Sequence, residues 1–396
     1  MKILLVHNDY GVFSGEEAVF EAMASLLERR GHTVRWFRRS SKEIPHMRFG
    51  RVRAFFSGIY NSGAAKAMRG VLAEYRPDIV HVQNVYPLIS PSVLSVCRRA
   101  RAPVVMTLQN YRLVCPSGLH QRNGRVCEKC CGGREYWCLL CNCEESLPKS
   151  VGYALRNWIA RRFGLFRRNV TLYVCLTEFQ KGRLVAEGFA PQRLMVVPNM
   201  TDATDDVGAP VAARPYVGYA GRVSPEKGIH LLLEAARRNP EIPFRVAGAY
   251  DRMPGVVRQA PPNLSFLGPL EHQAMDEFYR ASRMTVLCST WFEGLPMVLI
   301  EAMMRGTPVV APRIGGIPEV VDDGGTGVLF EPGNVDDLSD KVRHLWNHPD
   351  VCQQMGNAAR KKAIDQYSPE PYYRRLMEVY QRAVQLGPVG AVDAGR

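Results

Sequence analysis

The stretch CSTWFEGLPMVLIEAMMRGTPVVA, from Cys288 to Ala311, decides the predicted fold of this chain. It reads as the end of a buried strand, a loop, a helix from about Pro296 to Met304, and a second buried strand from Pro308 to Ala311. Pro296 suits the first turn of a helix, where its missing N–H costs nothing, and Gly306 is placed to end the helix. Strand, helix and strand in this order are typical of a doubly wound α/β domain.

Two carboxylates frame the start of this helix. Glu293 precedes it and Glu301 lies in its second turn, with seven residues between them. The free N–H groups of Gly294, Leu295 and Met297 and the positive end of the helix dipole would attract an anion such as a diphosphate. Glu301 could then hold the vicinal hydroxyls of a ribose, and Glu293 a second sugar. The alternative is that both are ordinary glutamates of a helix surface, one solvated and one capping.

A second motif lies upstream, in YAGRVSPEKGIHLLLEA from Tyr219 to Ala235. Arg222 and Lys227 stand on either side of the turn that opens the next predicted helix. Arginine offers a planar fork of donors and lysine a point charge, so the two suit a diphosphate. They could stabilise negative charge that develops on a leaving group. The alternative is a pair of solvated surface cations.

Together the two motifs resemble the donor site of retaining glycosyltransferases of family 4, also called glycosyl transferases group 1. The likeness extends roughly from Met1 to Tyr367. It implies an α/β chain of the GT-B fold, in which two Rossmann-like, doubly wound domains face a cleft. It also implies catalysis by Glu293, Arg222 and Lys227 without a divalent metal, with Glu293 positioning the sugar. The implied donor-binding residues are Gly221, Arg222, Lys227, Glu293, Gly294, Leu295, Pro296, Met297 and Glu301.

The chain of 396 residues is long enough for two domains, and 46% of its residues are hydrophobic. A polar segment without periodicity, TDATDDVGAPVAAR, marks the expected boundary. The resemblance implies that the final helix crosses back to the first domain. We therefore predict an acceptor-binding domain over 1–200, a linker over 201–214, a nucleotide-sugar-binding domain over 215–368, the crossing helix over 369–387 and a tail over 388–396.

The acceptor side of the site is predicted at the carboxyl ends of the N-terminal strands, where ligands gather in open α/β sheets. The strands concerned are expected over Asp78–Asn84 and Ala102–Pro116. Relatives often carry Gly-Gly where this chain has Ser14-Gly15, and His where it has Gln109, so an amide would replace an imidazole there. The predicted acceptor-side residues are Gly15, Glu16, Asn84, Gln109, Asn110 and Tyr111.

Seven of the eleven cysteines lie between Cys115 and Cys143. Two CxxC pairs in this Gly-rich segment are typical of a structural zinc site, because the segment has too few apolar residues to fold alone. The chain also resembles a glycosyltransferase subgroup with a Cys-rich insert, here about 112–148. An iron–sulfur cluster and free thiols in a loop are the alternatives. The candidate metal ligands are Cys115, Cys127, Cys130, Cys138, Cys141 and Cys143.

Charge is distributed unevenly along the chain. Residues 1–200 hold 30 Lys and Arg against 14 Asp and Glu, and residues 201–396 hold 21 against 24. Basic residues alternate with aromatics around 35–56, and a basic amphipathic helix is predicted from Ser150 to Phe166, so a peripheral membrane surface is expected. There is no run of about 18 apolar residues and no signal peptide, which predicts a cytoplasmic protein at the inner face of the membrane.

The predicted function is therefore that of a retaining hexosyltransferase in cell-surface polysaccharide synthesis, with no cofactor for catalysis. It would use a UDP- or GDP-sugar and a saccharide or a polyprenyl-diphosphate-linked acceptor. One alternative is a nucleotide-sugar 2-epimerase of the same fold. A second is a zinc-dependent nucleic-acid-binding protein, which the intact donor motif disfavours, so no nucleic-acid partner is expected. A third is a scaffold that binds the donor without turnover.

Overall fold

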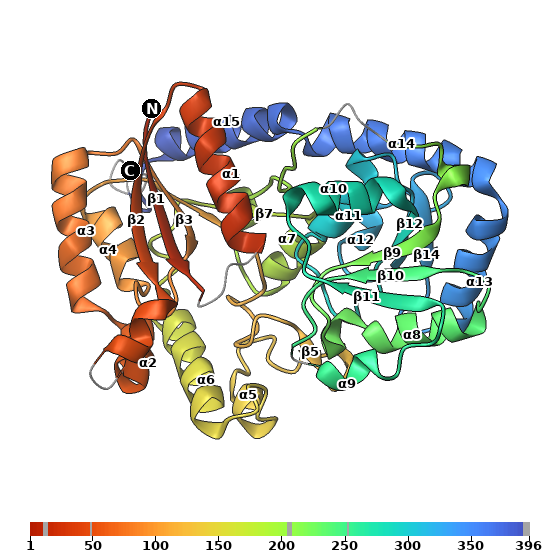
Figure 1. Cartoon of the computed structure of the whole chain (residues 1–396). Helices are drawn as coiled ribbons and strands as arrows, with labels where there is room; N and C mark the ends of the chain where they lie inside the picture. The colour runs from red at the N-terminus through yellow and green to blue at the C-terminus, as the bar shows by residue number, and fades with distance from the viewer. Residues whose placement is uncertain (11–14, 48–49, 204–207, 252, 391–396) are drawn as a thin grey trace. The chain divides into compact units, whose positions relative to one another are not determined.

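The computed structural model describes residues 1–10, 15–47, 50–203, 208–251 and 253–390 (Figure 1). Ser14, residues 204–207 of the predicted linker and the tail from 391 lie outside these ranges. The chain divides into two compact units. The first comprises 1–118, 128–198 and the chain from Tyr372 on, and the second comprises 119–127 and 199–371.

The first unit is built on a six-stranded parallel sheet in the order β2-β1-β3-β4-β7-β8. Ile3 to Val6 of β1 are fully buried, as expected for a central strand with helices on both faces of its sheet. The strands are β1 (Lys2–Asp9), β2 (Thr33–Ser40), β3 (Ile79–Asn84), β4 (Val104–Thr107), β7 (Leu172–Cys175) and β8 (Leu194–Val196). The helices that precede β8 are α1 (Gly15–Arg29), α2 (Gly50–Ile59), α3 (Ser62–Tyr75), α4 (Ser92–Arg99), α5 (Tyr136–Leu140), α6 (Leu147–Arg162) and α7 (Glu178–Ala186), with 3₁₀ turns at Ser41–His46 and Pro191–Arg193.

The second unit repeats this plan, with a six-stranded parallel sheet in the order β11-β10-β9-β12-β13-β14. The predicted fold class of two Rossmann-like α/β domains is thus confirmed. The strands are β9 (Tyr216–Ala220), β10 (Phe244–Ala247), β11 (Leu264–Gly268), β12 (Ser282–Val286), β13 (Val309–Pro312) and β14 (Gly327–Phe330), besides a hairpin of β5 (Gln121–Arg122) and β6 (Arg125–Val126). The helices are α8 (Ile229–Arg238), α9 (Pro254–Val257), α10 (His272–Ala281), α11 (Met297–Met304), α12 (Ile317–Val320), α13 (Val335–Asn347) and α14 (Pro349–Tyr367), with 3₁₀ turns at Val211–Ala213 and Pro225–Lys227.

One predicted strand is much shorter than expected. The segment from Ala102 to Pro116 was expected to be one strand, but β4 ends at Thr107. Beyond it the chain turns on itself, since the carbonyl of Tyr111 accepts the N–H groups of Val114 at 2.9 Å and Cys115 at 2.8 Å. Strand prediction failed here because Leu113, Val114 and Cys115, which pack in the turn, look the same in sequence as residues of a buried strand, although Gln109, Asn110 and Arg112 interrupt the pattern.

The last helix, α15 (Pro369–Leu386), packs on the first unit from Tyr372 on. The hydroxyl of Tyr380 lies 2.6 Å from Nδ1 of His81 on β3, and Nε2 of His81 lies 2.8 Å from the hydroxyl of Thr107. His81 is fully buried between these two partners. The hydroxyl of Thr171 also donates to the carbonyl of Gly387, 3.2 Å away. These bonds fix the C-terminal helix to the sheet of the first unit.

We expect this buried histidine to make the first unit sensitive to acid. Burial lowers the pKa of His81 to about 3, so the folded protein keeps a neutral ring while the unfolded chain takes up a proton below about pH 6.5. The stability associated with the neutral ring is therefore complete above that pH and is lost as the pH falls, by about 1.4 kcal/mol at pH 5.5. Urea unfolding at pH 7.5 and 5.5 measures this loss.

The variant His81→Gln should remove that share of the pH dependence, whereas His230→Gln, at an exposed position, should leave it unchanged. An equal loss in wild type and His81→Gln would refute the assignment. His7 contributes in the same direction in both proteins, because burial, with a smaller effect from Arg38, lowers its pKa to about 4.

Candidate functional site

The loop after β9 carries the two predicted cations, and two glycines set its path. Gly228 has a φ of 70°, and a Cβ on it would lie 1.9 Å from the carbonyl oxygen of Cys288. A Cβ on Gly248 would likewise lie 1.9 Å from the carbonyl oxygen of Gly221. No other residue could replace these glycines without a shift of backbone, so the loop lies directly against the end of β12. That approach places Lys227 beside the loop that follows β12.

Lys227 and Glu293 form an ion pair, with 2.7 Å between Nζ and Oε1. The same carboxylate oxygen accepts a hydrogen bond from Nε1 of Trp291 at 3.0 Å and one from the hydroxyl of Ser289. The Lys227 ammonium also lies 5.4 Å from the centre of the Trp291 ring. Glu293 is only 5% exposed. The lysine is therefore held in one position by a buried carboxylate and an aromatic ring.

Arg222, the second predicted cation, is oriented differently. Its Nη2 lies 2.9 Å from Oε1 of Glu226, four residues further along the same loop. Its side chain is half exposed. The structure thus brings Lys227 and Glu293 together and places Arg222 on the same loop, in a separate pair.

The helix that follows Glu293 begins one residue later than predicted. Pro296 is the N-cap of α11, with a φ of −77° and a ψ of 87°, and the first helical residue is Met297. Gly294 and Leu295 are buried just before it. In the described part of the chain, the N–H groups of Gly294, Leu295 and Met297 have no hydrogen-bond acceptor. An anion at this helix start would therefore find unpaired donors, as the sequence suggested.

Glu301 lies in the second turn of α11 and is held from the neighbouring helix. The hydroxyl of Tyr279 on α10 donates to its Oε2 at 2.8 Å. Burial raises the pKa of Glu301, and the hydrogen bond from Tyr279 opposes this. Arg305 donates to the carbonyl oxygen of Glu301 at 3.1 Å and pairs with Asp276. Glu301 is thus a carboxyl group of intermediate exposure that Tyr279 holds in position.

In the first unit, the predicted acceptor-side residues gather around Glu16. Its carboxylate accepts hydrogen bonds from the hydroxyl of Tyr10 at 2.8 Å and from Nδ2 of Asn110 at 3.0 Å. Its backbone carbonyl accepts one from Nε2 of Gln83 at 2.9 Å. Gly15 starts the same helix, α1, and a Cβ on it would meet nothing within 4 Å. A larger side chain would therefore fit at position 15, so a lack of room does not explain the glycine there.

A small hollow lies beside this network, at the carboxyl ends of β3 and β4. Asn84, Gln109 and Asn110 line it, as predicted for a ligand site. Tyr111 does not, because it is 2% exposed and its N–H donates to the carbonyl of Gly118 at 3.2 Å. Tyr111 is a packing residue in this structure.

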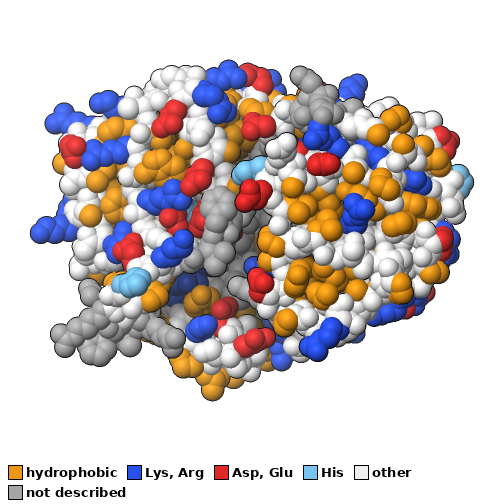
Figure 2. All heavy atoms as spheres, viewed as in Figure 1, with side chains coloured by type: hydrophobic (Ala, Val, Ile, Leu, Met, Phe, Trp, Pro, Cys, Tyr) orange, Lys and Arg blue, Asp and Glu red, His pale blue; other side chains and the backbone are white. Residues whose placement is uncertain are grey.

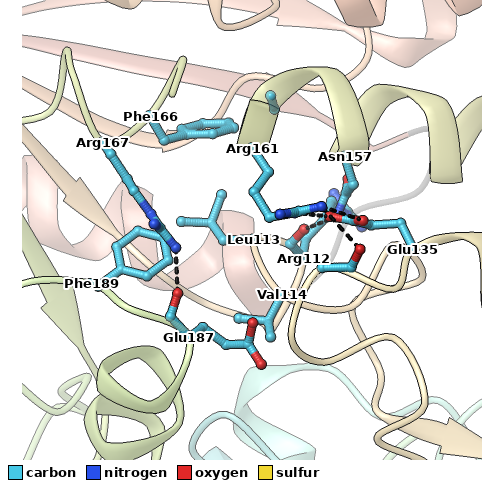
Figure 3. A pocket seen from close by; sticks show the side chains of 12 residues that line it. Arg112, Leu113, Val114, Glu135, Asn157, Arg161, Phe166, Arg167, Glu187 and Phe189 are labelled. Carbon is cyan, nitrogen blue, oxygen red and sulfur yellow. Dashed lines mark hydrogen bonds and ion pairs between the residues drawn. The ribbon is translucent and has the colours of Figure 1, made fainter. Parts of the chain in front are cut away.

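Arg112 is a member of this site that the sequence analysis missed. It lines the hollow, and its Nη1 lies 3.4 Å from the hydroxyl of Tyr10. Burial disfavours its charge, but Tyr10 and Glu16 outweigh burial and raise the pKa of Arg112. The sequence feature that could have identified Arg112 is its position directly after Asn110 and Tyr111, two predicted site residues. Arg112 also borders a second hollow, where Arg161 of α6 pairs with Glu135 at 2.6 Å (Figure 3).

Three of the predicted metal ligands, Cys130, Cys138 and Cys143, pack in one small cluster of the first unit. Cys127 follows β6, with its N–H 2.7 Å from the carbonyl oxygen of His120, and Cys141 is the C-cap of α5.

The chain has two Rossmann-like units, and one of them carries a lysine–glutamate pair and a second glutamate at a helix start. These are the features of a GT-B glycosyltransferase. Two family models match consecutive parts of the chain. The model described as Glycosyltransferase Family 4 matches residues 13–205, and the model described as Glycosyl transferases group 1 matches residues 202–362. The chain belongs to this glycosyltransferase family, and the predicted family is confirmed.

Curated relatives share parts of the chain. It is 34% identical over 194 residues to the sulfoquinovosyl transferase of Arabidopsis thaliana. The matched region covers 44% of this chain and 37% of that protein. It is 25% identical over 265 residues to an uncharacterised 42.6 kDa protein in the cps region of Klebsiella pneumoniae, which is 66% of this chain and 64% of that protein. The chain thus spans less than two thirds of either relative.

Solved structures share the fold over nearly the whole chain. Sucrose-phosphate synthase from Thermosynechococcus elongatus has a TM-score of 0.73 at 17% identity, covering 96% of this chain and 98% of that one. Anabaena HepE, in complex with UDP and glucose, has a TM-score of 0.64 at 20% identity, covering 96% of this chain and 100% of that one. At these identities the likeness is one of fold.

Proposed function

We propose that the chain transfers a sugar, with retention of configuration, from a nucleotide-sugar to a saccharide or lipid-linked acceptor in cell-surface polysaccharide synthesis. The observation that carries the proposal is the Lys227–Glu293 pair beside the start of α11. A diphosphate bound there would meet the ammonium of Lys227 and the unpaired N–H groups of the helix start, with Arg222 within the same loop. The UDP and UDP-glucose bound by Anabaena HepE support a nucleotide-sugar as donor.

In this proposal the cations take the place of a divalent metal. Lys227 and Arg222 stabilise the charge that develops on the departing diphosphate. Three donors bind Oε1 of Glu293, so in this proposal it orients Lys227 and the sugar instead of attacking the sugar as a nucleophile. Glu301 holds the ribose hydroxyls through its carboxylate. The hollow beside Glu16 and Asn110 in the first unit receives the acceptor.

We also propose that the first unit contacts the inner face of the cell membrane. Leu147, Val151, Leu155 and Trp158 of α6 recur every three to four residues and are all exposed, and hydrophobic side chains reach the surface there (Figure 2). The neighbouring Lys149 and Arg162 are exposed as well, so the helix suits an anionic lipid surface. No described helix is long and apolar enough to cross a membrane. Failure of the full chain to sediment with anionic vesicles would contradict this part of the proposal.

The donor site is tested by ligand-induced stabilisation of the folded chain. UDP, GDP, ADP and their common sugar conjugates are compared in a thermal-shift panel. A nucleotide at 100 times its Kd should raise stability by about 2.7 kcal/mol, and thus the Tm by about 5–10 °C. Glu301→Ala should weaken that nucleotide by about 10- to 150-fold, because hydrogen bonds to a charged group are lost.

Glu331→Ala, an exposed substitution in the same unit, serves as the control and should shift like the wild type. No shift with any nucleotide, or an equal shift in Glu301→Ala, would refute the donor-site assignment. Product analysis completes the test, because an isomerised donor without a transferred sugar would indicate an epimerase instead.

A further inference from the structure

His7, Asp9 and Glu17 lie together where β1 ends and α1 begins. His7 and Asp9 are two positions apart on β1, so their side chains leave the same face of the strand. Glu17 lies in the first turn of α1. One nitrogen of the imidazole and one oxygen of each carboxylate all lie within 4.8 Å of one another. The first unit therefore gathers one nitrogen and two oxygen atoms that could bind a metal ion.

The imidazole of His7 is buried without a hydrogen-bond partner. The residue is 1% exposed, and neither Nδ1 nor Nε2 has a partner among the described residues. The ring packs against Phe20, with 5.3 Å between the ring centres. A buried polar group normally finds a partner, because an unpaired one costs free energy. The unpaired nitrogens of His7 therefore point to a ligand that the described chain does not supply.

The spacing of His7 and Asp9 is that of two ligands and not of two partners. Nε2 of His7 lies 3.6 Å from Oδ1 of Asp9. This distance is too long for a hydrogen bond, and burial opposes the protonation of His7 that an ion pair would require. Two ligand atoms that share one ion in tetrahedral geometry, at bond lengths of about 2.0–2.2 Å, are about 3.4 Å apart. The observed distance is close to that value.

Both carboxylates are largely buried and held in place. Glu17 is 4% exposed, and its Oε1 accepts the N–H of Tyr10 at 2.6 Å. Arg38 donates Nε to the two oxygens of Asp9 at 2.7 and 2.8 Å, and Nη2 to Glu21 at 2.9 Å. An ionised carboxylate has about four acceptor sites, so Asp9 can accept from Arg38 and still bind an ion. Such outer hydrogen bonds orient the carboxylates of metal sites, and a cation between two carboxylates this close would remove their repulsion.

We propose that His7, Asp9 and Glu17 bind one divalent transition-metal ion, with water in its remaining positions. An imidazole nitrogen and carboxylate oxygens form a mixed set that suits Mn²⁺ and Zn²⁺. Lys227 and Arg222, which are assigned to the diphosphate, belong to the second unit and are not part of this site.

The ion would join the end of β1 to the start of α1. Glu16, the neighbour of Glu17, accepts hydrogen bonds from the hydroxyl of Tyr10 at 2.8 Å and from Nδ2 of Asn110 at 3.0 Å. An ion bound to Glu17 therefore also fixes the residue around which the acceptor-side side chains gather. Only this consequence rests on the proposed function, and the binding of the ion does not.

The test is the binding of Mn²⁺ to the chelator-treated full chain, followed by the electron paramagnetic resonance signal of the free ion. Mn²⁺ is chosen because it prefers oxygen and nitrogen ligands, so the cysteines compete little for it. We expect one bound ion per chain in the wild type. His7→Gln and Glu17→Gln should each weaken binding by more than about 100-fold, since even the loss of an outer hydrogen bond costs about 10- to 100-fold.

Two matched controls change exposed residues of the same unit. His46→Gln removes a histidine, and Glu28→Gln removes a carboxylate from α1, and both should bind Mn²⁺ like the wild type. Wild-type binding by His7→Gln, or an equal loss in His46→Gln, would overturn the proposed ligand set.

Because a variant could fail to fold, two measurements use the wild-type protein. Electron spin echo spectra of the bound Mn²⁺ should show coupling to one imidazole nitrogen. The Tm should rise with the concentration of Mn²⁺, since the three ligands meet only in the folded chain. A wild-type chain that binds no Mn²⁺, binds it without a nitrogen coupling, or keeps its Tm would overturn the proposal. Normal Mn²⁺ binding together with a failed nucleotide panel would refute the donor site alone.

Discussion

Lys227→Ala is expected to lower the rate of sugar transfer by about 10²- to 10³-fold, the usual cost of losing one donor that stabilises developing negative charge. The ammonium is held 2.7 Å from Glu293 and 5.4 Å from the centre of the Trp291 ring. The side chain therefore does not have to change conformation before it contacts a bound diphosphate. Turnover of the donor identified in the thermal-shift panel measures the effect, as kcat and KM separately. A loss mainly in kcat would show that Lys227 acts in the transition state.

Two further variants separate charge from shape in this prediction. Lys227→Met keeps the length of the side chain without its charge and should be as slow as Lys227→Ala. Lys361→Ala removes an exposed lysine of α14 in the same unit and should leave the rate unchanged. Near-normal turnover of Lys227→Ala with a normal unfolding curve would refute the role assigned to this cation.

The sequence predicted the framework of both units because the information there is local. Ile3 to Val6 and Val309 to Pro312 are continuous apolar runs between turn residues, which indicate buried parallel strands without reference to any partner. The fold class follows from their alternation with helices. The strand predicted over Ala102–Pro116 failed beyond Thr107, where Gln109, Asn110 and Arg112 interrupt the apolar residues and the chain turns.

The site was less predictable because its geometry depends on distant parts of the chain. Lys227 and Glu293 were each singled out from their own motif, but the ion pair between residues 66 positions apart required the approach of Gly228 to Cys288. Arg112 was missed for the same reason, since its partners Tyr10 and Glu16 lie about a hundred residues upstream. Spacing in a sequence identifies candidate groups, and only the fold decides which of them pair.

The second large effect concerns stability. Glu293→Ala is expected to lower the free energy of unfolding of the second unit by about 3–5 kcal/mol, which is typical when one partner of a buried ion pair is removed. Glu293 is 5% exposed and accepts from Lys227, Ser289 and Trp291. Without it, a cation and two neutral donors are left without their acceptor in a largely buried site. Urea unfolding followed by tryptophan fluorescence measures the loss.

The comparison of Glu293→Ala with Glu293→Gln separates the two duties of this carboxylate. The amide oxygen of glutamine can still accept from Ser289 and Trp291, so Glu293→Gln should cost only about 1–3 kcal/mol. Its transfer rate should nevertheless fall, because Lys227 loses the charge that orients it. Asp340→Ala breaks an exposed ion pair with Arg343 on α13 and should cost at most about 1 kcal/mol. If Glu293→Ala were as mild as that control, the buried pair would not be the element that holds this loop, and Lys227 would have to be positioned by Trp291 instead.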